Sequence, residues 1–138
     1  MTTNKVAVVA LDRRYKKLED GLKKKAGEIL LFLKQSGAKI EVYLVASPKM
    51  KQLNRQYQGK DKATNVLSFG APQNFPKANS NFLGEVYLCP PYIRRHGENI
   101  QALLAHGILH LLGFNHTRLS DRIIMEETEK KLLTWLNH

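Results

Sequence analysis

The sequence has a single cysteine among its 138 residues, which excludes an intramolecular disulfide framework. It also lacks a charged segment followed by an apolar one at its start, so we expect a reducing, cytoplasmic setting. Long apolar runs are missing too. The stretch 102–112 carries two histidines and falls short of the about 20 residues that span a bilayer. We expect a soluble protein with no membrane partner and, from its length, one domain, residues 1–138.

Acidic residues are scarce beside basic ones, and the imbalance lies in one half of the chain. The formal net charge is +10. Residues 1–62 hold 15 lysines and arginines against 6 acidic residues, whereas residues 63–138 hold 7 against 6. Such an excess suits a polyanion such as RNA, because each phosphate contact releases counterions. A lysine-rich face that only keeps the protein in solution is the simpler explanation, so the charge alone does not predict RNA binding.

Hydrophobic periodicity predicts a small α+β fold. Short runs rich in β-branched and apolar residues indicate strands at 5–11, which we expect to be buried, and at 39–46, 66–69 and 83–88. The segment 70–81 is rich in Gly, Pro and Asn and is expected to be a loop. No repeat or linker divides the chain. The predicted architecture is a small mixed β-sheet packed by helices.

Apolar residues at three- and four-residue steps predict four helices. The first covers about 15–33, with Gly37 as its expected C-cap, and the second follows Ser47 as N-cap and ends at Gly59. The apolar side of the second helix consists of Met50, Leu53 and Tyr57. The last two helices are expected at about 98–112 and 121–136, the latter with Met125, Leu132 and Leu136 inward.

Three of the five histidines lie in one short segment, HGILHLLGFNH, from His106 to His116. His106 and His110 are four residues apart on a predicted helix and therefore share a face. Gly113 is expected to end the helix in a left-handed conformation, which would return His116 toward the same point. Three neutral imidazole nitrogens with one position left open are typical of a catalytic zinc site. We therefore predict a metal centre, because chance placement would have to explain the spacing and the glycine together.

The same spacing, H-x-x-x-H-x-x-G-x-x-H, occurs in the metzincin peptidases, where a glutamate follows the first histidine as general base. Here that position is Gly107, which cannot transfer a proton. A bound zinc ion would still lower the pKa of its water to about 7. The leaving group of an RNA strand demands less of an acid than the amine of a peptide does. The pattern therefore favours phosphodiester cleavage over peptide cleavage.

At these residues the sequence resembles the YbeY endoribonucleases, whose motif is H-G-x-x-H-L-x-G-Y/F-D-H. The segment 57–69 (YQGKDKATNVLSF) supports the resemblance, as does 83–89 (LGEVYLC), which is similar to the family's L-G-D-I-x-I-C strand. It covers the chain from about Lys39 to the end. It implies a zincin-like metallohydrolase architecture and a zinc-dependent, single-strand-specific endoribonuclease. The implied role is 16S ribosomal RNA 3′-end maturation and ribosome quality control, with the small ribosomal subunit as partner.

The resemblance also assigns roles to residues. His106, His110 and His116 would bind the metal beside a cleft for single-stranded RNA. The family's arginine that is thought to contact the scissile phosphate is Gln58 here, and an amide cannot make a bidentate, charge-assisted contact. Either Arg55, one helical turn earlier, or Lys60 is a candidate replacement.

Two further positions near the motifs have a functional and a structural interpretation. Asp61, which the family motif retains, is either a catalytic carboxylate or a turn residue. Asn115 stands where the family has an aspartate that could orient a ligand imidazole, so we expect it to hold the metal more weakly.

The remaining residues of interest are basic, aromatic or sulfur-containing. The candidate RNA-binding lysines are Lys23, Lys24 and Lys25 on the first helix, together with Lys60. Cys89 and Trp135 are expected to pack in the protein interior rather than to bind a ligand. His96 and His138 are expected to be ordinary surface residues.

Two other functions remain open at this stage. A ribosome-associated assembly or binding factor with little catalysis would need no turnover, and Gln58 favours it. A small metallopeptidase would use the same three ligands, and Gly107 argues against it. The endoribonuclease is the function that we expect.

Overall fold

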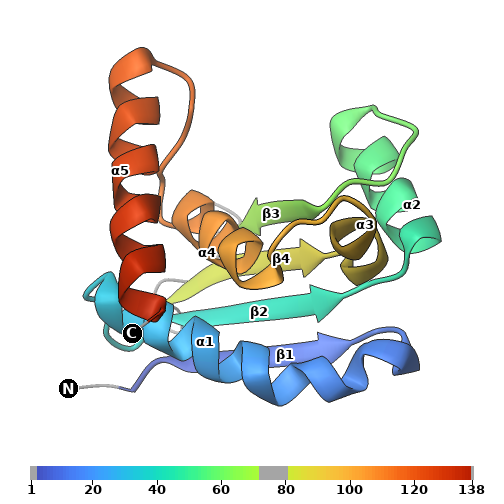
Figure 1. Ribbon diagram of the computed structural model, residues 1–138, viewed down its shortest axis with the longest axis horizontal. Helices are drawn as coiled ribbons and strands as arrows, with labels where there is room; N and C mark the ends of the chain where they lie inside the picture. The colour runs from blue at the N-terminus through green and yellow to red at the C-terminus, as the bar shows by residue number, and fades with distance from the viewer. Residues whose placement is uncertain (1–2, 72–80, 138) are drawn as a thin grey trace.

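A four-stranded mixed sheet forms the centre of the computed structural model, which describes residues 3–71 and 81–137 (Figure 1). Its strand order is β1-β2-β4-β3, with β3 antiparallel to β4 and the other neighbours parallel. The strands are β1 (Lys5–Ala10), β2 (Lys39–Leu44), β3 (Val66–Gly70) and β4 (Phe82–Leu88). The predicted mixed sheet is confirmed. Most of the predicted loop 70–81 lies outside the described residues.

Two helices lie on one face of this sheet, α1 over its β1 edge and α4 over β3 and β4, and α5 packs against both (Figure 1). The helices α2 and α3 lie at the end of the sheet to which β2 and β4 point. The helical elements are η1 (Arg13–Leu18, a 3-10 helix), α1 (Glu19–Phe32), α2 (Ser47–Gln58), α3 (Pro90–Arg95), α4 (Ile100–Leu111) and α5 (Leu119–Leu136). No helix in the described part of the chain is long and apolar enough to cross a membrane.

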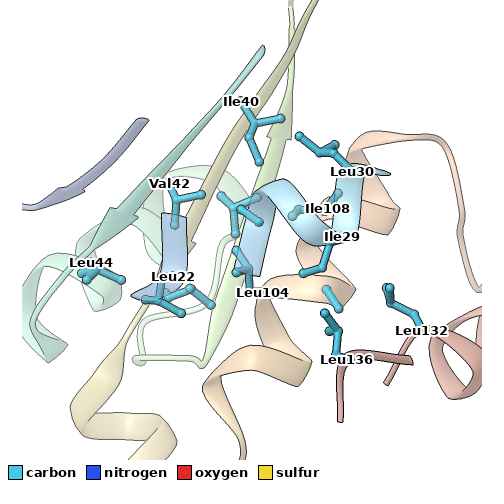
Figure 2. Packing of buried hydrophobic residues seen from close by; sticks show 14 of the residues in the cluster. Leu22, Ile29, Leu30, Ile40, Val42, Leu44, Leu104, Ile108, Leu132 and Leu136 are labelled. Carbon is cyan, nitrogen blue, oxygen red and sulfur yellow. The ribbon is translucent and has the colours of Figure 1, made fainter. Parts of the chain in front are cut away.

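The main core lies between the sheet and the helices α1, α4 and α5 (Figure 2). Buried side chains of α1, such as Leu22 and Ile29, meet those of β2, such as Val42. Each fully buried side chain of this size contributes about 1.5–3 kcal/mol of hydrophobic stabilisation. The residues predicted to face inward from α5, at 125, 132 and 136, are buried as expected. A second, smaller cluster lies at α2 and α3 and includes Met50, Leu53, Leu67 and Cys89.

Strand β1 is not buried, so the prediction made from its apolar run is wrong. Its residues alternate between exposed and half-buried, and 42% of Val9 is exposed. The reason is its position: among the described strands β1 is at the edge and pairs with β2 alone, and its alternate residues that do not pack against the core are exposed. An apolar run alone does not distinguish an edge strand from a central one.

The ends of two helices also differ from the expectation. The first helix begins as a 3-10 turn and ends at Phe32, with Leu33 as its C-cap in place of Gly37. The left-handed residue next to this end is Lys34 (φ 60°), and Gly37 is also left-handed (φ 70°) but lies farther along the chain. The Gln35 amide donates to the Leu30 carbonyl at 2.9 Å, which closes this end. Helix α2 begins one residue earlier than predicted, so Ala46 is its N-cap, and the Ser47 hydroxyl lies 3.9 Å from the Cys89 sulfur instead.

Helix α4 lies so close to β3 and β4 that only glycine fits at position 107. A Cβ atom there would stand 2.7 Å from the Val86 Cγ1 and 3.1 Å from the Ser68 Oγ. The Ser68 hydroxyl donates a hydrogen bond to the Gly107 carbonyl at 3.0 Å, which links the helix to the sheet. Position 107 therefore faces the sheet, and the glutamate of the peptidases has no room here.

We expect Gly107→Glu to lower the free energy of unfolding by at least about 3 kcal/mol, because it forces a charged side chain into a close-packed contact. The measurement is urea unfolding followed by circular dichroism. The matched control is Gly21→Glu, since Gly21 is also helical and a Cβ atom added to it would meet no atom within 4 Å. Equal stability of the two variants would contradict the close contact at position 107.

Candidate metal centre and cleft

Helix α4 presents two of the three clustered histidines. Asn99 caps its N-terminus, with its side-chain oxygen accepting from the amides of Gln101 at 2.9 Å and Ala102 at 3.1 Å. One turn apart on the helix, His106 and His110 turn their Nε2 atoms toward each other, 3.1 Å apart. The helical register therefore points both nitrogens at one place, as the spacing predicted.

The third histidine reaches the same place through the turn at Gly113. This glycine has a φ of 98°, and the Phe114 amide donates to the Leu109 carbonyl at 3.1 Å. The predicted chain reversal is confirmed. Asn115 forms a turn around His116, because its side-chain oxygen accepts from the Thr117 amide at 2.9 Å. It therefore stabilises the loop that carries His116, and weaker metal binding than with the family's aspartate stays a prediction.

The three histidines fit a single metal ion. One ligand nitrogen from each lies within 4.8 Å of the other two. Two nitrogens bound at about 2.0–2.1 Å to a tetrahedral ion are about 3.3 Å apart, close to the spacing of His106 and His110. His116 is exposed, so it can make the small adjustment that the third bond requires. In the described ranges, no carboxylate or thiol joins this cluster, which leaves a fourth position open.

The charge state of the centre also suits a metal. Burial, together with the neighbouring imidazoles of His106 and His116, lowers the pKa of His110 below its usual value. A hydrogen bond to the backbone of Phe114 offsets this in part. His110 is therefore neutral at physiological pH, which is the form that binds a metal.

A glutamate that the sequence did not reveal also belongs to this centre. The Nδ1–H group of His106 donates to Oε1 of Glu129, on α5, at 3.3 Å. A signal for it exists in the sequence: residues 125, 129, 132 and 136 follow helical spacing, so Glu129 falls within the predicted inward stripe of the last helix.

A cleft of about 350 Å³ opens beside the histidines. Edge strand β3 forms one wall, and α4 forms another with His106 and His110. Gln58, the last residue of α2, lines the cleft as well, so the structure brings this predicted site residue to the metal centre.

Comparison with known proteins identifies the family. A family model described as Endoribonuclease YbeY matches residues 3–137. The Endoribonuclease YbeY of Nitrosomonas eutropha is 37% identical over 109 residues, 73% of this chain and 74% of its own. That of Persephonella marina is 38% identical over 105 residues, 70% of this chain and 69% of its own. The chain belongs to the YbeY endoribonuclease family.

A solved structure agrees with this assignment. The solution structure of TM1509 from Thermotoga maritima superimposes with a TM-score of 0.58 at 29% sequence identity. The match covers 92% of this chain and 85% of that one. The predicted YbeY membership, the α+β architecture and the enzyme class, a hydrolase, are confirmed together.

In this YbeY chain, a buried amide holds the segment around Gln58 in place. Asn54 is the one buried polar residue of the described core, and its side-chain NH₂ group donates to the Lys62 carbonyl at 2.9 Å. The Lys60 amide donates to the Asn54 carbonyl at 3.3 Å. Gly59, with a φ of 70°, closes the helix as predicted. These contacts fix the end of α2 and hence the position of Gln58 at the cleft.

The other predicted catalytic residues lie on either side of Gln58 in the chain and do not line the cleft. Arg55 and Asp61 face each other at 3.9 Å, and both are largely exposed. Lys60 is exposed in the same turn. None of these three residues is part of the cleft wall.

The candidate lysines of α1 lie farther away, because α1 packs over β1, at the opposite edge of the sheet from β3 (Figure 1). Lys23 and Lys24 are exposed, and Lys25 pairs with Glu28 at 3.4 Å.

The cysteine, the tryptophan and the remaining described histidine lie away from the cleft wall. Cys89 is fully buried as a free thiol. Trp135 packs on Phe32 with ring centroids 5.2 Å apart, although part of its ring stays exposed. His96 is an exposed residue stacked on Tyr92, as expected of a surface histidine. His138 lies outside the described residues.

We expect His110→Ala to abolish stoichiometric binding of a divalent metal and to leave the fold intact, because the two remaining imidazoles cannot hold the ion tightly. Metal content after dialysis is measured by mass spectrometry, with circular dichroism for the fold. His96→Ala, which removes an exposed histidine elsewhere, is the control. A full equivalent of tightly bound metal in His110→Ala would show that the ligand assignment is wrong.

Proposed function

We propose that this protein is a zinc-dependent endoribonuclease that cuts single-stranded RNA in the cytoplasm. Its place would be 16S ribosomal RNA 3′-end maturation and ribosome quality control, on the small ribosomal subunit. One observation carries the proposal: a centre of three histidines opens onto a cleft in a chain whose relatives are named Endoribonuclease YbeY. Three imidazoles with an open fourth position favour zinc.

A zinc ion bound here would act as a Lewis acid toward the phosphate and activate water. The protein's own groups have separate tasks. His106, His110 and His116 hold the ion, and the cleft beside β3 holds the strand. Gln58 can donate a hydrogen bond to a phosphate oxygen from the cleft wall, without the charge that an arginine would bring.

An exposed aromatic ring beside Gln58 supports a single-stranded substrate. Tyr57 does not face inward as predicted: 56% of it is exposed, because its ring lies across the surface of Phe69 with centroids 4.8 Å apart. Unpaired bases stack on such rings, whereas the bases of a duplex are already stacked on each other. Tyr57 therefore offers an exposed stacking surface next to Gln58 in the chain.

The structure argues against the peptidase alternative more strongly than against the assembly factor. The peptidase function needs a general base next to the first ligand, at position 107. A side chain there has no room, because the helix is in contact with the sheet at this residue. The assembly factor with little catalysis retains one favourable observation, the uncharged Gln58 at the cleft. It is the second candidate.

A cleavage assay tests the proposal directly. Zinc-loaded protein should cut single-stranded RNA faster than a duplex of the same sequence and leave casein intact. Addition of a chelator, or the change His110→Ala, should abolish the cleavage. If metal and RNA both bind but no RNA is cut, the assembly-factor alternative holds. Cleavage of casein in place of RNA would favour the peptidase.

We expect Gln58→Arg to raise single-turnover RNA cleavage by at least about tenfold, because a fixed cation at the phosphate stabilises charge that develops in the transition state. Zinc content should not change. Gln56→Arg is the matched control, since it adds the same charge to an exposed position of α2 that does not line the cleft. If both variants leave the rate unchanged and Arg55→Ala or Lys60→Ala abolishes it, one of those residues already supplies the cation.

For the lysines of α1 we propose an extended RNA path across the helical face. Replacing Lys23, Lys24 and Lys25 with glutamine should weaken RNA binding and reduce the slope of log affinity against log salt by about 1 for each phosphate that is no longer neutralised. Fluorescence anisotropy at several salt concentrations measures this. An unchanged slope would mean that these lysines only contribute to solubility.

A further inference from the structure

We infer that Glu129 is a positioning residue of the metal centre, which holds the imidazole of His106 so that its Nε2 atom faces the metal. The inference rests on the metal-binding part of the proposed function and does not depend on RNA cleavage.

The hydrogen bond between the two side chains determines which nitrogen of His106 is free. A carboxylate only accepts hydrogen bonds, so the 3.3 Å contact places a proton on Nδ1 of His106. In the neutral ring the other nitrogen, Nε2, then has a free lone pair. That atom is the one that lies 3.1 Å from Nε2 of His110, on the metal-binding side. Glu129 therefore selects the tautomer that can bind a metal.

Glu129 lies where a carboxylate needs a hydrogen-bond partner. It lies on the inward stripe of α5, between Met125 and Leu132, which are fully buried. Its side chain is 23% exposed, and that of His106 is 27% exposed. A carboxylate in such a place is costly unless it has a partner. Within residues 3–71 and 81–137 no lysine or arginine forms an ion pair with it, so the imidazole is the partner that the fold provides.

Glu129 is not itself a metal ligand. Its oxygen contacts Nδ1, which lies on the side of the ring away from Nε2, so the imidazole stands between the carboxylate and the metal position. The cluster of potential ligands accordingly contains the three histidines without Glu129. The carboxylate acts through His106, by fixing the ring orientation and by making Nε2 a stronger donor.

The test is the zinc affinity of Glu129→Ala, measured in the absence of RNA by competition with a coloured chelator. Loss of such a supporting carboxylate typically weakens metal binding about 10- to 100-fold. The control is Glu126→Ala, which removes the same charge from an exposed position one turn away on α5 and should bind zinc like the wild type. Glu129→Gln should bind zinc better than the alanine variant, because its amide oxygen can still accept from Nδ1.

A second readout separates positioning from a merely structural role. Nitrogen-15 NMR of the histidine rings in the metal-free protein should show the proton of His106 on Nδ1, and its shift toward Nε2 in Glu129→Ala. A folded Glu129→Ala that loses less than tenfold in zinc affinity, or an equal loss in Glu126→Ala, would overturn the inference. If the alanine variant does not fold, Glu129→Leu takes its place, because leucine fills similar space and accepts no hydrogen bond; wild-type zinc affinity and an unchanged tautomer in Glu129→Leu would overturn the inference. Zinc binding that behaves as expected without any RNA cleavage would contradict only the proposed function.

Discussion

Close contact between α4 and the sheet at Gly107 is the constraint on which the site depends. Since no side chain separates the helix from Val86 and Ser68, the helix lies directly against β3 and β4. The two histidines on its adjoining face are thereby brought to the edge of the sheet, where the cleft opens beside β3. The same contact removes the position from which a peptidase would supply its base. The contact at Gly107 thus places the histidines of α4 beside the cleft and also excludes a glutamate base at position 107.

Much of this could be predicted because it depends on local spacing. The i, i+4 histidine pair needs only a helix, and the return of His116 needs only a left-handed turn, for which Gly113 is suited. The inward residues of α5 follow from their periodicity in the same way. Each of these inferences uses interactions within a few residues of chain, and each is confirmed by the structure.

Apart from the ends of two helices, the errors and omissions concern relations between distant segments. Burial of β1 depends on its place in the strand order, which an apolar run does not encode. The hydrogen bond between Glu129 and His106 joins α5 to α4 across 23 residues, and on a charged helix one glutamate resembles its neighbours Glu126 and Glu127. That Gln58 lines the cleft while Arg55 does not likewise depends on where α2 lies relative to the rest of the fold. Tertiary contacts of this kind become visible only when the fold is assembled.

The attachment of α5 to the metal centre gives the molecule a property that follows from the order of protein synthesis. The three imidazoles are all present in the growing chain once His116 has been made, but the helix that supports His106 follows afterwards. The same helix delivers Leu132 and Leu136 to the core. The contact of Glu129 with His106 therefore forms after all three histidines have been made. The metal centre and the main core are thus completed by the same helix, so a chain that stopped before α5 would lack both the partner of His106 and these core residues.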